Sequence, residues 1–112
     1  MSIFSKFFRR DDLLCETDLV KPYCRKAKEA LMRDDLPRAI AYLERGIHLA
    51  PNVLDLYLQR AQIRQYGMDD CAGALRDYKY ILRALERTPD PDLEHKCRQG
   101  MKDMMATAGA AS

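Results

Sequence analysis

Apolar residues recur through most of the chain at spacings of three and four, which is typical of one face of an α-helix. A first series comprises Tyr23, Ala27, Ala30 and Leu31, and a second comprises Leu36, Ala39, Ile40, Leu43 and Ile47. Charged and polar residues fill most of the positions between them. The pattern predicts an all-α fold of amphipathic helices that pack through their apolar faces.

The predicted helices are bounded by residues that start or stop helices. Arg33-Asp34-Asp35 supplies a polar turn and an N-cap, and Pro37 falls in a first turn, where its missing N–H costs little. Pro51-Asn52 should end one helix and can cap the next. We expect Gly67 to end a later helix in the left-handed conformation, with Asp69 or Asp70 capping its successor.

A fifth helix is predicted after the segment Thr88–Asp92, with Asp90 as its N-cap and Pro91 at its first position. Its apolar stripe consists of Leu93, Cys97, Met101 and either Met104 or Met105. We expect this helix to run over about 91–105 and to cover the last apolar face of the fold. Residues 106–112 are small and polar, and they are predicted to form a flexible tail.

The first two pairs of helices repeat each other. At an offset of 34 residues Tyr23 aligns with Tyr57, Lys26 with Arg60 and Ala27 with Ala61. At an offset of 35, the further aligned pairs are Asp34-Asp35 with Asp69-Asp70, Ala39 with Ala74, Leu43 with Tyr78 and Ile47 with Leu82. The change of offset predicts one inserted residue in the turn around Gly67.

The positions of aromatic and small residues in these units resemble those of the tetratricopeptide-repeat family. The matching residues are Tyr23, Ala27, Ala39, Leu43, Gly46 and Pro51 in the first unit, and Tyr57, Ala61, Ala74 and Tyr78 in the second. Lys26, Ala30, Arg60 and Arg64, where that pattern has leucine or an aromatic, and Ile81 and Glu86 depart from it. The resemblance implies antiparallel helical hairpins of a two-repeat α-solenoid with a C-terminal capping helix. Its expected divisions are an N-terminal arm at 1–19, a repeat domain at 20–105 with repeats at 20–53 and 54–88, and the tail.

The same resemblance implies a binding groove lined by the first helix of each repeat. The residues expected to point into it are Cys24, Lys28, Leu31, Leu58, Gln59, Gln62 and Tyr66. An alternative interpretation makes Leu31 and Leu58 core residues and leaves Gln59 and Gln62 exposed to solvent. Cys24 and Gln59 replace two of the residues with which some relatives hold the carboxyl end of chaperones, so binding of a chaperone tail is disfavoured.

The N-terminal arm is a short basic amphipathic segment. Its apolar face consists of Ile3, Phe4, Phe7 and Phe8, and Lys6, Arg9 and Arg10 lie beside them. One interpretation is a cap over the open edge of the first repeat, which a two-repeat stack needs. The other is attachment to a membrane surface, which would make the protein a peripheral membrane adaptor.

Composition narrows the class of protein. The 112 residues carry 19 Lys and Arg against 17 Asp and Glu, and a net charge of +2 argues against nucleic acid as the partner. The chain contains no apolar run of the roughly 20 residues that a membrane helix requires, and no secretory leader, so we expect a cytoplasmic protein. The four cysteines lack any C-x-x-C spacing and are expected to be reduced.

The candidate chemistry does not indicate an enzyme. His48 and His95 are the only histidines, and neither belongs to a motif with a nucleophile and an acid. His95 and Cys97 point to different sides of a helix and do not indicate a metal site. We therefore expect a scaffold, adaptor or chaperone-like protein without cofactor that binds a peptide or helix of another protein. A homodimer through the first or last helix is a further possibility, and the Met101, Met104 and Met105 cluster is adaptable enough to serve as a contact surface.

Overall fold

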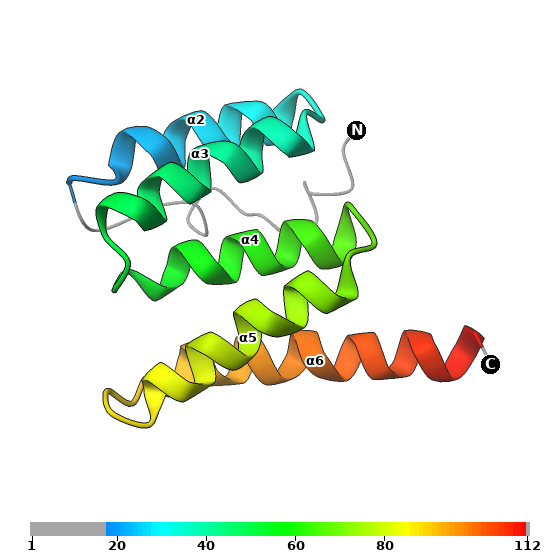
Figure 1. The fold of residues 1–112 in the computed structure, drawn as a ribbon. Helices are drawn as coiled ribbons and strands as arrows, with labels where there is room; N and C mark the ends of the chain where they lie inside the picture. Colours follow the sequence, from blue (N-terminus) through cyan, green and yellow to red (C-terminus); the bar gives the residue numbers. More distant parts are fainter. Residues whose placement is uncertain (1–17, 112) are drawn as a thin grey trace.

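The computed structural model describes residues 18–111, and these residues form five helices without a strand. The helices are α2 (Lys21–Met32), α3 (Leu36–Leu49), α4 (Leu54–Tyr66), α5 (Cys71–Leu85) and α6 (Pro91–Ala111). Consecutive helices run antiparallel to each other (Figure 1). The prediction of an all-α fold is confirmed.

The helices pack mainly against their neighbours in the chain. The pair α2 and α3 forms the first hairpin, and the pair α4 and α5 forms the second hairpin. Contacts between α3 and α4 join the two hairpins, and α6 packs against α5 and also contacts α4. Each hairpin therefore lies against the element that follows it.

The two hairpins turn in the same way. Asp34 and Asp69 each have a positive φ, 60° and 53°, and both belong to the residue types that tolerate the left-handed conformation best after glycine. The next residue caps the following helix in both cases. The Asp35 carboxylate accepts a hydrogen bond from the Arg38 N–H at 3.3 Å, and the Asp70 carboxylate accepts one from the Gly73 N–H at 3.0 Å.

Several predicted boundaries need correction. Gly67 is not left-handed, because its φ is −109° and the positive φ falls on Asp69 instead. Asn52 does not cap α4, whose N-cap is Val53 without a side-chain hydrogen bond. The cap of α6 is confirmed, since Asp90 accepts from the Leu93 N–H at 3.2 Å.

Helix α6 continues to Ala111, past its expected end near Met105 and through most of the predicted flexible tail. The residues beyond Met105 are mostly alanine, which has the highest helix propensity. The methionines expected to form one sticky surface are divided. Met101 and Met104 pack against the core while Met105 is 75% exposed.

Small residues lie where the helices of each hairpin approach. Ala27, Ala39, Ala61 and Ala74 are each 0% exposed. One core cluster joins α2, α3 and α4, and a second joins α4, α5 and α6. Helix α4 contributes Leu56 and Ile63 to the first cluster and Leu58 and Ala61 to the second, which makes it the central element of the fold (Figure 1).

Candidate functional site

The residues predicted to line a groove lie on α2 and α4, but most of them are buried. Cys24, Leu31, Leu58 and Gln59 are 2%, 3%, 6% and 2% exposed, whereas Lys28, Gln62 and Tyr66 are half-buried. Leu31 and Leu58 are thus core residues, as the alternative interpretation has it, and Gln59 is not exposed to solvent. We call Lys28, Gln62 and Tyr66 the α2–α4 face. The arm residues Ile3, Phe4, Phe7 and Phe8 lie outside the described residues.

The cysteines differ in state. Cys24 is disulfide-bonded, so the expectation of a reduced thiol is wrong at this position. Cys71 and Cys97 are free thiols, the first exposed and the second buried. Burial raises the pKa of Cys97 to about 12, which keeps this thiol protonated and unreactive near neutral pH.

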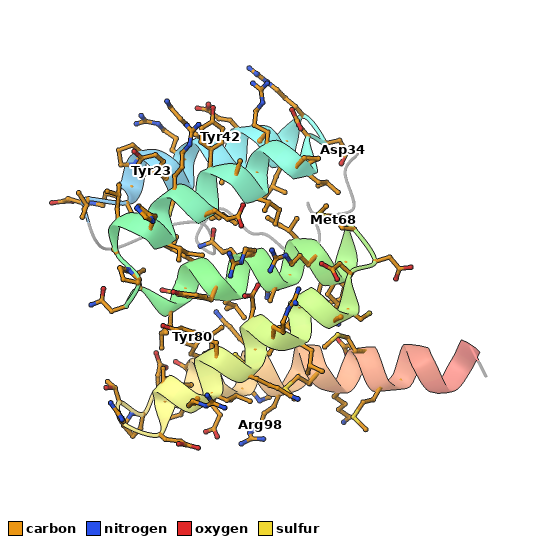
Figure 2. The ribbon with its side chains drawn as sticks, viewed as in Figure 1. Tyr23, Asp34, Tyr42, Met68, Tyr80 and Arg98 are labelled. Carbon is orange, nitrogen blue, oxygen red and sulfur yellow. The ribbon has the colours of Figure 1, made fainter. Side chains whose placement is uncertain are left out.

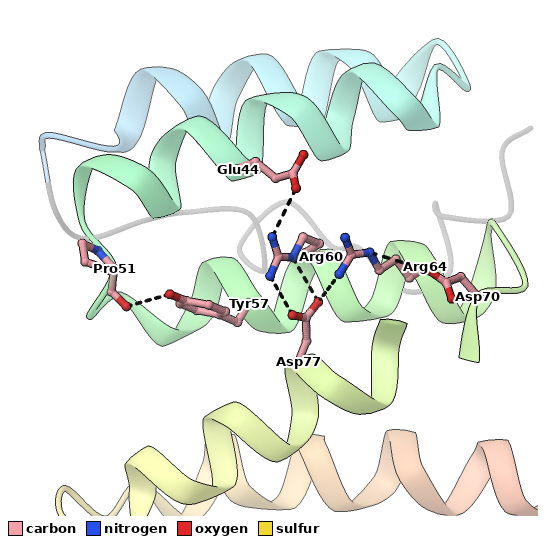
Figure 3. A network of polar contacts seen from close by, with 7 residues as sticks. All are labelled: Glu44, Pro51, Tyr57, Arg60, Arg64, Asp70 and Asp77. Atoms are coloured by element: carbon pink, nitrogen blue, oxygen red, sulfur yellow. Dashed lines mark hydrogen bonds and ion pairs between the residues drawn. The ribbon is translucent and has the colours of Figure 1, made fainter. Parts of the chain in front are cut away.

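A buried carboxylate fixes α4 to α5. Asp77, whose side chain is 5% exposed, accepts two hydrogen bonds from Arg60, at 3.1 Å from Nε and 2.7 Å from Nη2. A third comes from Nη1 of Arg64 at 3.1 Å (Figure 3). Arg60 also reaches the Glu44 carboxylate of α3 at 3.5 Å, and Arg64 approaches Asp70 at 3.9 Å. The network therefore connects both hairpins through α4.

Aromatic contacts continue this network along α4. The ring of Tyr57 stacks on that of Tyr80 with centroids 4.4 Å apart, and the Arg60 guanidinium lies 5.6 Å from the Tyr57 ring centre. The Tyr57 hydroxyl donates to the carbonyl oxygen of Pro51 at 3.0 Å. Burial, with the neighbouring Tyr80, raises the pKa of Tyr57 to about 12.

Hydrogen bonds also tie the other end of α4 to α6. The Tyr66 hydroxyl donates to Asp103 at 2.8 Å, and burial together with this bond raises the pKa of Tyr66 to about 12. Gln65 accepts from the Tyr78 hydroxyl at 2.6 Å and donates to the carbonyl oxygen of Gly100 at 2.9 Å. Tyr66 of the α2–α4 face is therefore held in place from α6.

Sequence reasoning did not find Asp77. A signal was present, because Arg60 and Arg64 lie four residues apart on a helix whose repeat pattern favours apolar residues there. Two cations on a buried face need a carboxylate partner. The sequence alone could not select Asp77 from the other acidic residues, since the pairing depends on how α5 packs on α4.

The raised tyrosine pKa values predict alkaline instability. A phenol titrates near 10 in the unfolded chain and about 12 for Tyr57 and Tyr66 in the folded one, so the folded state binds more protons between these values. The stability that these two tyrosines contribute should therefore be constant below about pH 10 and should be lost as the pH rises towards about 12. Urea unfolding at several alkaline pH values would measure this fall. Replacing both tyrosines by phenylalanine should reduce its slope, and an unchanged slope would contradict the assignment.

Comparison with known proteins provides no family for this chain. No known family model matches it, and no curated protein or solved structure is similar to it at a significant level.

Within residues 18–111, no group of three His, Cys, Asp or Glu side chains is placed to bind a metal ion. No described helix is both long and apolar enough to cross a membrane.

Proposed function

We propose that the protein is a tetratricopeptide-like repeat module that binds another protein, and that a peptide or helix of this partner lies along the α2–α4 face. The observation that carries the proposal is the duplicated hairpin. Both copies have the same buried alanines, the same left-handed aspartate in the turn and the same aspartate cap. Repeated hairpins of this kind present extended surfaces, and protein binding is their usual role.

The α2–α4 face has groups suited to such contacts. Lys28 and Gln62 offer hydrogen-bond donors at the surface, and Tyr66 adds a ring with a fixed orientation. An aromatic residue that is already immobilised loses little conformational entropy when a partner binds to it. Tyrosine is also among the residues that contribute most to protein interfaces.

The test is affinity capture from a lysate of the native cell, with bound proteins identified by mass spectrometry. The intact chain is compared with a Lys28→Glu plus Gln62→Glu variant of the α2–α4 face. The matched control is Lys79→Glu plus Thr88→Glu, which makes the same change in charge at exposed positions elsewhere. We expect a partner that the intact chain and the control retain and the face variant loses. A partner retained by all three proteins would place the binding surface elsewhere.

A further inference from the structure

A second surface lies on the side of the first hairpin that faces away from α4 (Figure 2). Tyr42 of α3 is half-buried there, with Nζ of Lys26 5.7 Å and Cζ of Arg45 5.8 Å from its ring centre. The exposed side chains of Arg33 and Arg38 line the same depression. We call Lys26, Arg33, Arg38 and Arg45 with Tyr42 the basic cluster.

In the second hairpin, the place equivalent to the basic cluster holds a buried ion pair. At the repeat offsets, Lys26 corresponds to Arg60 and Tyr42 corresponds to Asp77. Arg60 forms an ion pair with Asp77 of its own hairpin and a second, longer one with Glu44 of the preceding hairpin. In the first hairpin a tyrosine takes the place of Asp77, and no other hairpin precedes it among the described residues. Lys26 therefore has no counterpart of either Asp77 or Glu44.

The cations of the basic cluster are therefore largely without counter-charge. Among residues 18–111, no carboxylate forms an ion pair with Lys26, Arg33 or Arg45, and Arg38 is paired with Asp35 at 3.3 Å. The two depressions beside Tyr42 are lined by these four cations and by two carboxylates, Glu29 and Asp35, which leaves an excess of two positive charges there. Like charges held this close repel each other, and a bound carboxylate would relieve that repulsion.

A cavity of about 120 Å³ opens between these side chains. Its lining residues are Lys26, Glu29, Ala30, Arg33, Asp35, Arg38 and Tyr42. Ala30 corresponds to Arg64, whose long side chain binds Asp77 in the second hairpin. The first hairpin therefore lacks this carboxylate, and it has room for a side chain of a partner that brings one.

We propose that the basic cluster binds an acidic segment of another protein, whose carboxylates take the places that Asp77 and Glu44 have in the second hairpin. Glu29 and Asp35 border the cluster and would repel a continuous phosphate backbone, which argues for spaced carboxylates over nucleic acid or an anionic membrane. This surface is distinct from the α2–α4 face. Lys26 and Lys28 lie two residues apart on α2 and so point to opposite sides of it.

The test uses a fluorescent glutamate-rich peptide and its glutamine counterpart, with binding to the full chain followed by fluorescence anisotropy. We expect the glutamate peptide to bind in a salt-dependent way and the glutamine peptide not to bind. Lys26→Glu plus Arg45→Glu should weaken the affinity at least about tenfold, because two attractions become repulsions. The variant of the α2–α4 face, Lys28→Glu plus Gln62→Glu, should bind the peptide as the intact chain does, so the two proposals can fail separately.

A second pair of variants tests the comparison between the hairpins. Tyr42→Asp supplies the missing carboxylate internally and should abolish peptide binding without removing a cation, whereas Tyr42→Asn should retain it. Circular dichroism establishes that each variant is folded. Three outcomes would each overturn the proposal. The Asp and Asn variants could bind the peptide equally, or the Lys28→Glu plus Gln62→Glu variant could lose as much affinity as the Lys26→Glu plus Arg45→Glu variant. The third outcome is tighter binding of RNA or anionic vesicles than of the peptide. A homodimer that dissociates on Lys26→Glu plus Arg45→Glu would also overturn it, because a second copy would then occupy the cluster.

Discussion

Replacement of Asp77 by asparagine is expected to lower the free energy of unfolding by about 3 kcal/mol. Asparagine keeps the size of the side chain but removes the charge that Arg60 and Arg64 both bind. The two guanidiniums would remain close together, 16% and 20% exposed, without their common counter-ion. Loss of one partner from a buried pair costs about 3–5 kcal/mol, and we expect the lower end because both arginines partly reach solvent.

Urea unfolding followed by circular dichroism would measure this loss as a lower midpoint at an unchanged slope. The matched control is Glu44→Gln, which removes one negative charge from the same network at an exposed position, 3.5 Å from Arg60. Since exposed ion pairs contribute little, the control should lose less than about 1 kcal/mol. Similar losses in both variants would show that net charge, and not the buried pair, sets the stability.

Substitution of Gly100 by alanine should destabilise the fold by about 2 kcal/mol, although alanine favours a helix over glycine by about 1 kcal/mol. A Cβ atom at this position of α6 would overlap the phenol group of Tyr78. The Tyr78 ring cannot easily move, because it is 0% exposed and its hydroxyl is bonded to Gln65. The same Gln65 donates to the Gly100 carbonyl, so any shift of α6 disturbs two hydrogen bonds.

Gly46→Ala is the control for this prediction. Gly46 is also a buried helical glycine, but its added Cβ would meet the terminal methyl of Leu56 at 3.2 Å. Leu56 is also buried, but the shift required is only a few tenths of an ångström at the end of its side chain, and the gain in helix propensity compensates. We expect a change within about 1 kcal/mol, measured as a thermal midpoint near that of the unmodified chain. Equal losses at both glycines would show that close approach of α5 and α6 is not the cause.

The positions of the helices followed from local patterns. The apolar spacing located α2 to α6, and the aspartate pairs identified the caps, because a capping carboxylate acts on N–H groups only two or three residues away. The errors were also local. Asp69 and not Gly67 took the positive φ, and the alanines after Met105 extended α6.

The surfaces depended on contacts between helices. The groove residues inferred from the repeat pattern were divided by packing into buried residues and a smaller exposed set, since exposure depends on every neighbouring element. Packing between helices also decides which partner a charged side chain has. The sequence contains Lys26 and Arg60 at equivalent positions, yet one lies beside a tyrosine ring and the other holds a buried aspartate. Periodicity along one helix establishes that a helix forms and which side is apolar, whereas the partner of a charged side chain is chosen by the helix packed against it, and that choice belongs to the tertiary structure.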